Sequence, residues 1–497
     1  MTTAGFKKEN WLFALLLLAV FACAISGQSL WIDEACTALK AQQPTLAGWW
    51  QQMRHDQGSD LQMPLYMLWI WGCGKIFGTS ELALRAVNLF WFAPGLLALT
   101  RALAGQRRLQ RAVFLTTALS PFAWYYLDEA RPYAMQLGAS LFLFAALFRW
   151  RQNPAAAATE RGRVRGYVVA VVLLAGGSLL GMIWAAAALA MLRVIFPPAD
   201  FRSLIRNNLS AWLVGLISSA LLGGYYLWTL HAGARASAVG TTDGKSLAFV
   251  FYELLGFAGL GPGRLEIRAG NWQAFQACGI NLALLAGLLV ILLGWAIKQL
   301  FESRERKKIY PLLLLLAGPV VFILVAGVIL HFRVLGRHFT PFAPVLFFAL
   351  AAGAAAAWRQ SVIGKAVVIG FFALYLFSSL SLRFAARHEK DNYRAAAALA
   401  TAALAHGQSV WWNADYNGAI YYRVSMAPRD GLSQHGQAIL RVNETPEMIL
   451  ATAPADVIIA SRSDVYDGFG TLAEFLQSAH YQQITNLAAF SVWERKK

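Results

Sequence analysis

The sequence predicts a polytopic α-helical membrane protein with about eleven transmembrane helices, followed by a water-soluble α/β domain. Hydrophobic residues make up 58% of the 497 residues and charged residues only 14%, which is more apolar material than a soluble core needs. The apolar residues form repeated runs of the length that crosses about 30 Å of hydrocarbon. From residue 388 onward the composition changes to that of a soluble domain.

The positive charge of the chain indicates membrane topology and not nucleic-acid binding. The net charge is +17, but the basic residues gather in short segments between apolar runs and do not alternate with aromatic residues. Lysine and arginine concentrate in the cytoplasmic loops of membrane proteins. We therefore use these segments to orient the predicted helices.

The first span covers roughly residues 11–30 and follows Lys7 and Lys8, which places the acidic pair Asp33 and Glu34 outside. The apolar run 64–77 has a helical length of only about 21 Å, so we expect an interfacial helix on the outer surface. If that helix stays outside, the next span, about 83–103, brings the following arginines to the cytoplasm. The later spans then also place their basic loops in the cytoplasm, and their odd total number leaves the C-terminus outside.

We expect two domains. Residues 1–387 form the membrane domain, with outer loops at 31–81 and 231–270, and residues 388–497 form the outer domain. The 231–270 loop is rich in glycine and is a candidate lid or acceptor loop. In the outer domain we expect helices at 392–405 and 472–478 and strands at 409–412, 456–460 and 488–493. No glycine-rich phosphate loop occurs there, which argues against a soluble sugar-nucleotide site.

An ordered series of short motifs resembles the GT-C membrane glycosyltransferases, specifically the bacterial family 39-like group related to protein O-mannosyltransferases and lipid A aminoarabinose transferases. The motifs span most of the chain: Trp31-Ile32-Asp33-Glu34, Met63-Pro64-Leu65-Tyr66, Phe77-Gly78-Thr79-Ser80-Glu81 with Arg85, Ser120-Pro121, Tyr125-Tyr126, Glu129-Ala130-Arg131-Pro132-Tyr133, Arg337 with Pro341 and Pro344, and Asn392-Tyr393-Arg394-Ala395-Ala396.

The resemblance implies a sugar donor linked to polyprenyl phosphate, an acceptor hydroxyl on a protein, lipid or polysaccharide, and transfer on the periplasmic face. It implies a bacterial inner-membrane protein, in which the orientation given by the basic residues makes the N-terminus cytoplasmic and the C-terminus periplasmic. The chain departs from the commoner pattern at Gln62-Met63-Pro64, where His-Pro-Pro is frequent, and at Asp128, where glutamine is usual. These departures leave the acceptor and the second acidic role open.

Asp33 and Glu34 are the candidate catalytic residues. The resemblance implies that Asp33 is the base that accepts the proton of the attacking hydroxyl. The alternative is that Asp33 caps an outer helix over residues 34–42. Glu34 tunes its neighbour or holds the acceptor, because adjacent carboxylates rarely point at one atom.

Three further polar residues are candidates for the acidic part of the site. Asp60 is a candidate second carboxylate, with His55 as its hydrogen-bonding partner, although both also suit a solvated loop. Glu129 belongs to the motif before Arg131. We expect no required cofactor, although a divalent metal held by Asp33, His55 and Asp60 is compatible with the residue types.

Arg131 is the main candidate for the lipid phosphate, since a fixed guanidinium can donate two N–H groups to the leaving oxygen atoms. The alternative is an ion pair with Asp128 or Glu129 that anchors the loop. A second outer basic cluster supplies the other candidates, and the full set of candidate phosphate-binding residues is Arg131, Tyr133, Arg333, Arg337 and His338.

Two other functions fit a polytopic chain of this kind. One is a polymer ligase or oligosaccharyltransferase that uses a lipid diphosphate, which needs more positive charge at the phosphate. The other is a flippase of lipid-linked sugars. Transporters place ionisable residues near the membrane midplane, whereas the charges here lie at span ends on one face, which favours an enzyme.

Overall fold

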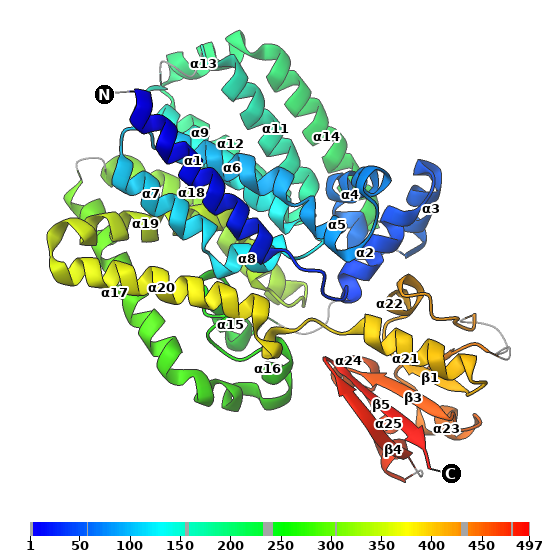
Figure 1. The fold of residues 1–497 in the computed structure, drawn as a ribbon. Helices are drawn as coiled ribbons and strands as arrows, with labels where there is room; N and C mark the ends of the chain where they lie inside the picture. Colours follow the sequence, from blue (N-terminus) through cyan, green and yellow to red (C-terminus); the bar gives the residue numbers. More distant parts are fainter. Residues whose placement is uncertain are drawn as a thin grey trace. The chain divides into compact units, whose positions relative to one another are not determined.

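The computed structural model describes residues 3–56, 58–154, 159–231, 242–303, 306–428, 436–478 and 481–496. The chain divides into two compact units (Figure 1). Unit 1 comprises Met1–Ser26, Pro44–Gly78 and Ala83–His388, and unit 2 comprises Gly27–Gln43, Thr79–Leu82 and Glu389–Lys497. Unit 2 therefore takes in two short segments from the N-terminal part of the chain.

Unit 1 is helical. Its longer helices are α1 (Thr3–Ala24), α6 (Leu89–Ala102), α7 (Arg107–Ala118), α9 (Tyr133–Gln152), α11 (Arg161–Gly177), α12 (Leu179–Ile195), α14 (Leu209–His231), α17 (Gly279–Glu302), α18 (Arg306–Ile329), α19 (Ala343–Gln360) and α20 (Val362–Phe384). Shorter elements connect them: α3 (Leu46–Asp56), η1 (Ser59–Gln62), α4 (Pro64–Phe77), α5 (Glu81–Ala86), α8 (Pro121–Leu127), α13 (Pro198–Asn207), α15 (Gly244–Leu254), α16 (Arg264–Gly270), η2 (Asn271–Cys278), η3 (Gly336–Phe342) and η4 (Ala386–His388).

Unit 1 is a multi-pass membrane domain. In the described part of the chain, six helical segments are long and apolar enough to cross a membrane: Glu81–Ala102, Leu209–His231, Gln273–Glu302, Ile309–Ile329, Gly336–Gln360 and Val362–Phe384. Trp11–Ala24 and Leu179–Ile195 are shorter apolar helices. The predicted first span, 11–30, extends six residues beyond the end of α1 at Ala24, and the second, 83–103, covers α5 and α6. The crossings beyond the six segments stay a prediction.

Small residues and local caps set the helix packing. Gly95 of α6 and Gly138 of α9 face each other so closely that a Cβ atom on either would overlap the backbone of the other helix. The predicted third span is broken between α7 and α8, where Ser120 accepts a hydrogen bond from the Ala123 amide at 3.3 Å. Pro121, which has no amide hydrogen, occupies the first turn of α8.

The interfacial helix predicted at 64–77 has the observed bounds of α4, Pro64–Phe77. Proline suits a first helical turn because it has no amide hydrogen to leave unpaired. Gly78 ends the helix with φ of 80°, a conformation that costs other residues energy. The 231–270 loop contains α15 and α16, while residues 232–241, including Arg235, lie outside the described residues.

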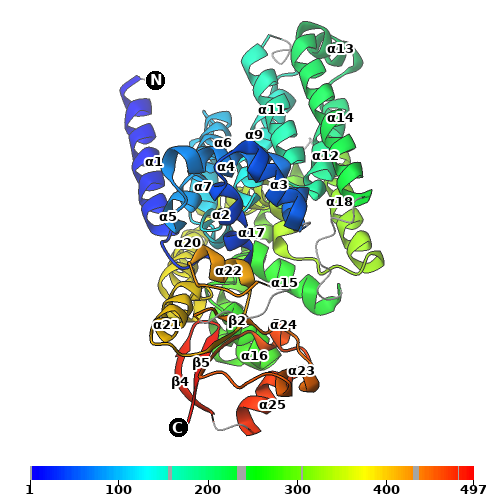
Figure 2. The same ribbon diagram turned by 90° about the vertical axis from the view of Figure 1, so that its right-hand side faces the viewer.

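Unit 2 contains a mixed five-stranded sheet with strand order β2-β1-β3-β5-β4. The strands are β1 (Val410–Asn413), β2 (Ile439–Leu440), β3 (Val457–Ser461), β4 (Tyr481–Leu487) and β5 (Phe490–Arg495), with β2 and β3 parallel to β1 and β5 antiparallel to β3 and β4. Figure 2 shows the same strands from the side. The expected α/β domain is confirmed. Its strands β1, β3 and β5 were predicted from the sequence, whereas β2 and β4 were not.

Helices cover both faces of this sheet. They are α2 (Ile32–Gln42), α21 (Tyr393–Ala405), α22 (Tyr416–Tyr421), α23 (Pro446–Leu450), α24 (Ser463–Tyr466) and α25 (Thr471–Ser478). Trp412 and Ile459 pack with residues of α21 on one face, while Trp411 and Ile458 pack with residues of α25 on the other. This alternation follows from the two-residue period of a strand. Ile32 of α2 packs against the α21 side.

Candidate functional site

Asp33 and Glu34 lie in the first turn of α2, within unit 2. The residue that precedes the helix is Trp31, and no side chain caps this end, so the alternative that Asp33 is the N-cap is wrong. The reason is that the helix begins at Ile32, two residues before the expected start. Carboxylates in a first turn are favoured by the helix dipole. Asp33 is half-buried, and its backbone carbonyl accepts a hydrogen bond from Thr37 at 3.0 Å.

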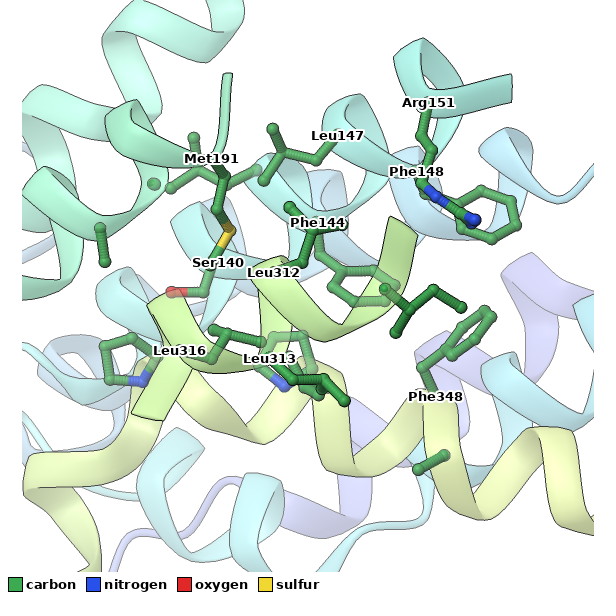
Figure 3. A pocket seen from close by; sticks show the side chains of 18 of the residues that line it. Ser140, Phe144, Leu147, Phe148, Arg151, Met191, Leu312, Leu313, Leu316 and Phe348 are labelled. Atoms are coloured by element: carbon green, nitrogen blue, oxygen red, sulfur yellow. The ribbon is translucent and has the colours of Figure 1, made fainter. Parts of the chain in front are cut away.

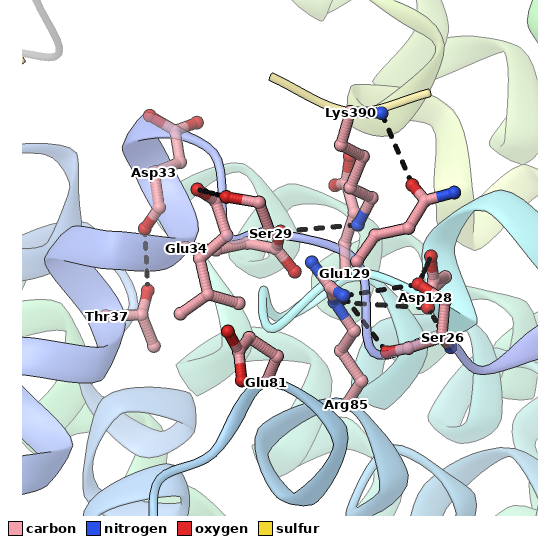
Figure 4. A network of polar contacts seen from close by, with 12 residues as sticks. Ser26, Ser29, Asp33, Glu34, Thr37, Glu81, Arg85, Asp128, Glu129 and Lys390 are labelled. Atoms are coloured by element: carbon pink, nitrogen blue, oxygen red, sulfur yellow. Dashed lines mark hydrogen bonds and ion pairs between the residues drawn. The ribbon is translucent and has the colours of Figure 1, made fainter. Parts of the chain in front are cut away.

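Glu34 is fully buried and pairs with Lys390 from the segment that precedes α21 (Figure 4). The Nζ of Lys390 lies 3.3 Å from Oε2 of Glu34, and the lysine side chain is only 12% exposed. The amide of Lys390 also donates to Oε1 of Gln28 at 3.3 Å. A buried carboxylate of this kind requires a charged or hydrogen-bonding partner. This geometry suits a residue that holds the start of α2 in place.

Further hydrogen bonds within unit 2 fix the residues around α2. Arg394 of α21 donates to Oε1 of Glu81 at 2.6 Å and to the carbonyl of Gly27 at 2.6 Å. The Tyr422 hydroxyl accepts from the Leu30 amide at 2.8 Å and contacts Glu81 at 3.1 Å. The sheet domain therefore binds both N-terminal segments of unit 2.

In unit 1, Asp128 binds the end of α1. Its Oδ1 accepts from the amide of Ser26 at 2.6 Å and its Oδ2 from the Ser26 hydroxyl at 2.8 Å. The fully buried Arg85 donates to the carbonyl of Ser26 at 3.0 Å and lies 3.9 Å from Asp128 (Figure 4). The aspartate that departs from the common motif therefore has a structural role here.

Arg131 pairs with Asp60. Its NH1 lies 2.6 Å from Oδ1 of Asp60, and its NH2 donates to the Ser59 hydroxyl at 3.2 Å. Arg131 is 2% exposed and Asp60 5%. The sequence alternative named Asp128 or Glu129 as the partner; the ion pair that the structure places at Arg131 is with Asp60, while Asp128 accepts from Ser26. The structure thus joins two of the predicted site residues, which are 71 positions apart.

Glu129 is held on the other side of the same loop. Asn88 donates to its carbonyl at 2.7 Å and to the carbonyl of Leu127 at 3.0 Å. The carboxylate of Glu129 is buried and accepts a hydrogen bond from the Tyr125 hydroxyl. This loop is therefore fixed at each of its polar residues.

A row of tyrosines between two arginines connects this loop with η3. The Arg337 guanidinium lies 5.9 Å from the Tyr133 ring, Tyr133 lies 4.8 Å from Tyr126, and Tyr126 lies 5.1 Å from Tyr125. At the other end of the row, the guanidinium of Arg264 lies 4.2 Å from the Tyr125 ring. Guanidinium groups over aromatic faces gain cation–π energy and keep their edges available as donors.

Glu253 of α15 links the two ends of this row. Its Oε1 accepts from Arg264 at 2.7 Å and its Oε2 accepts from the Gly336 amide at 2.9 Å. Neither Glu253 nor Arg264 is among the site residues predicted from the sequence. A lone carboxylate in the apolar segment 247–258 was the available signal, because such a group needs a partner when it is buried.

The remaining candidates lie apart from these contacts. The side chain of His55 is 85% exposed and lies 3.4 Å from Asp56, so its expected bond with Asp60 is not observed. Arg333 is exposed, and Nδ1 of His338 accepts from the Leu335 amide at 3.2 Å. Within the described ranges, no three histidine, cysteine, aspartate or glutamate side chains form a group that could hold a metal ion.

Comparison with known proteins relates this fold to membrane glycosyltransferases. No protein-family model and no curated sequence matches the chain. The apo crystal structure of ArnT from Cupriavidus metallidurans superimposes with a TM-score of 0.55 at 13% identity, covering 98% of both chains. The undecaprenyl-phosphate complex of that ArnT gives 0.48 at 13% identity, covering 99% of this chain and 98% of ArnT.

The arabinofuranosyltransferase AftD from mycobacteria gives a TM-score of 0.45 at 13% identity, with 98% of this chain matched to 40% of AftD. The match to apo ArnT extends over both units of the chain, including the sheet domain. The fold expected from the sequence motifs is therefore confirmed: the chain has the GT-C fold of ArnT over nearly its whole length.

Proposed function

We propose that this protein is a glycosyltransferase that moves a hexose or pentose unit from a polyprenyl-phosphate donor to a hydroxyl acceptor on the periplasmic face. The observation that carries the proposal is the ArnT fold over 98% of the chain. The ordered motifs around Asp33 and Arg131 support it. ArnT has been crystallised with undecaprenyl phosphate, and we propose the same class of lipid as the carrier here.

In the proposed reaction the acceptor oxygen attacks the anomeric carbon as the bond from that carbon to the phosphate oxygen breaks. Asp33 takes the proton of the hydroxyl, and polyprenyl phosphate leaves as a monoester with one additional negative charge. One displacement inverts the anomeric configuration and requires no covalent intermediate. Half-burial of Asp33 suits a base that must meet an acceptor from water.

Arginine side chains in unit 1 bind the leaving phosphate in this proposal. Arg131 is fixed by Asp60 and Ser59, so its guanidinium has one orientation before the donor arrives. Arg337 lies over Tyr133, with Arg333 and His338 on the same segment. Guanidinium groups in fixed positions stabilise charge that grows on a leaving oxygen.

Placement in a bacterial inner membrane, with a cytoplasmic N-terminus and a periplasmic C-terminus, is part of the proposal. The supporting observation is that α9, α12 and α19 each carry arginine in the last turn, as the positive-inside rule requires of helices that end in the cytoplasm. Cysteine labelling of exposed positions in intact cells tests this orientation.

The test is mass spectrometry of envelope glycans, glycolipids and glycoproteins from cells that contain the native chain, Asp33→Asn or Glu474→Gln. Glu474 is an exposed first-turn carboxylate of α25 and serves as the matched control. We expect one sugar modification to disappear with Asp33→Asn and to persist with Glu474→Gln at equal protein levels. Persistence in both variants would remove Asp33 from the mechanism.

Assays with purified protein distinguish this glycosyltransferase from the two alternative functions. Purified protein with a polyprenyl-monophosphate sugar should consume the donor, whereas an oligosaccharyltransferase or ligase consumes only the diphosphate-linked glycan. A flippase moves the lipid-linked sugar across vesicles and leaves it intact. We propose that no metal is required, so EDTA should leave the rate unchanged. A loss that Mg²⁺ or Mn²⁺ restores would assign a cation to the reaction.

A further inference from the structure

Three aromatic side chains from two helices of unit 1 meet in one cluster. Trp50 belongs to α3, and Tyr225 and Trp228 belong to α14. The ring centroid of Trp50 lies 5.7 Å from that of Trp228 and 6.3 Å from that of Tyr225, and the Tyr225 and Trp228 centroids lie 5.8 Å apart. Each ring therefore contacts the other two, at separations that aromatic pairs prefer. We call this cluster the aromatic triangle.

The aromatic triangle is partly open to the surface. Trp49, the neighbour of Trp50, is 7% exposed, whereas Trp50 is half-buried and Trp228 is 40% exposed. Tyr225 and Trp228 are three positions apart, so both side chains lie on one face of α14. A ligand can therefore lie against the exposed parts of the rings, while the buried parts keep the rings in place.

Polar residues adjoin the triangle on α3. Arg54 lies one helical turn after Trp50 and is exposed, as is His55. Aromatic residues near the end of a span commonly form an interfacial belt, and the exposed Leu227 of α14 suits that role for Trp228. Trp50 comes instead from a short helix whose exposed residues after it are polar, which places water beside its ring.

The triangle is attached to the segment that fixes Arg131. The hydroxyl of Tyr225 donates to the carbonyl of Leu61 at 2.8 Å. Leu61 follows Asp60 in η1, and Asp60 pairs with Arg131. A molecule held on the triangle is therefore next to the segment that positions the guanidinium assigned to the donor phosphate.

The hydrocarbon part of the donor has a separate place. Unit 1 contains an apolar cavity of about 340 Å³, and its lining includes Phe144 and Phe148 of α9 and Phe348 of α19 (Figure 3). The cavity reaches Pro341 of η3, the element that carries Arg337. It therefore adjoins the proposed donor site, and none of its described lining residues belongs to α3 or α14.

A sugar ring fits the triangle and its surroundings. One face of a sugar ring presents C–H groups that pack against aromatic rings, while the hydroxyl groups at its edge donate and accept hydrogen bonds. Arg54 supplies N–H donors one helical turn from Trp50. We propose that the triangle binds a sugar ring of the acceptor, which makes the acceptor a saccharide. The role as acceptor rests on the proposed transferase function, whereas binding at the triangle does not require the reaction.

The test is saturation-transfer-difference NMR of the purified full chain with the methyl glycosides of glucose, galactose, mannose and N-acetylglucosamine, without donor. The detergent has a zwitterionic headgroup, because a maltoside headgroup is itself a saccharide and would compete. We expect at least one glycoside to receive saturation, and its signal to fall at least fivefold in Trp50→Leu and in Trp228→Leu. Trp50→Phe keeps a ring and should retain most of the signal. The matched control is Trp358→Leu, because Trp358 of α19 is also 40% exposed, and it should bind like the native chain.

Transfer kinetics distinguish an acceptor site from a donor site. In reconstituted sugar transfer, Trp228→Leu should raise the KM for the saccharide acceptor at least fivefold and leave the KM for the lipid donor unchanged. A rise in the donor KM alone would assign the triangle to the sugar of the donor and overturn the proposal.

Three binding results would also overturn it. One is the lack of any glycoside signal above that of detergent alone. Another is native binding by both leucine variants, and the third is an equal loss in Trp358→Leu, which would indicate a general effect of tryptophan at the membrane interface. Trp228 is partly exposed, so its variant tests the proposal even where Trp50→Leu fails to fold. If Asp33→Asn leaves every envelope sugar in place while glycosides still bind at the triangle, the transferase proposal fails and the saccharide site stands.

Discussion

The buried ion pair between Glu34 and Lys390 makes a prediction about how the sheet domain supports α2. Lys390→Met removes the ammonium group and leaves the carboxylate of Glu34, which is 0% exposed, without the partner 3.3 Å away. Removing one member of a buried pair costs roughly 3–5 kcal/mol. The lysine side chain is 12% exposed, so water replaces part of the loss, and we expect a cost of about 2–3 kcal/mol.

Thermal unfolding of the purified chain measures this cost, together with the rate of sugar transfer. We expect Lys390→Met to lower the Tm by roughly 4–10 °C if unit 2 unfolds as a domain of ordinary size. The rate should fall as well, because Asp33 precedes Glu34 in the same helical turn. Lys496→Met is the matched control, since that lysine is exposed in the same unit.

A double-mutant cycle identifies the pair as the cause. Glu34→Gln with Lys390→Met leaves a neutral amide in place of a buried carboxylate that has lost the ammonium group of Lys390, so the double variant should unfold at a higher temperature than Lys390→Met alone. If Lys390→Met is as stable as Lys496→Met, or if the two substitutions simply add, the pair does not hold α2. The reasoning would then be wrong even if Asp33 is the catalytic base.

Three further predictions follow from contacts in unit 1. Arg131→Lys keeps the charge but cannot bind both Asp60 and Ser59 through one planar group, so the transfer rate should fall roughly 10- to 100-fold; an unchanged rate would remove Arg131 from phosphate binding. Gly336→Ala places a methyl group against Glu253 and should cost roughly 1–3 kcal/mol and raise the KM for the donor; a native Tm and KM would contradict the role of this contact. Burial and the nearby Arg387 lower the pKa of His388 to about 4. The hydrogen bond to the Gly259 carbonyl acts in the opposite direction but is the smaller effect. The folded protein keeps this ring neutral, so the free energy of unfolding is highest above about pH 6.5 and falls as the pH is lowered toward 4. In His388→Asn the free energy of unfolding should fall by roughly 1–2 kcal/mol less over that range. An identical pH profile of unfolding in the variant would refute this.

Local signals were sufficient to predict many helices. The bounds of α4 follow from Pro64 at its start and Gly78 after its end, because each residue has a conformational preference that needs no tertiary partner. Asn392 likewise marks the start of α21, where its side chain accepts a hydrogen bond from the Ala395 amide at 3.1 Å. The apolar runs that predict spans act over similarly short distances in the sequence.

Side-chain contacts between segments far apart in the sequence could not be predicted from local patterns. Arg131 was predicted as a phosphate ligand from its motif, but its pairing with Asp60 joins two loops whose charged residues each had nearer candidates in the sequence. Arg85 was known only as part of a motif, and its complete burial against Ser26 depends on how α1 ends. Periodicity reports which face of a helix is buried and does not identify the residue that it meets.

The membership of α2 in unit 2 is the clearest case of tertiary structure that no local pattern predicts. The composition changes at residue 388, which suggests that the soluble domain consists of the C-terminal residues alone. The structure adds Gly27–Gln43 and Thr79–Leu82 to that domain through Arg394, Tyr422 and Lys390. Because Asp33 lies in one of these added segments, the sheet domain determines the position of the proposed base. A chain that ends before residue 389 would keep the Trp31-Ile32-Asp33-Glu34 motif and lose the partner that Glu34 needs when it is buried.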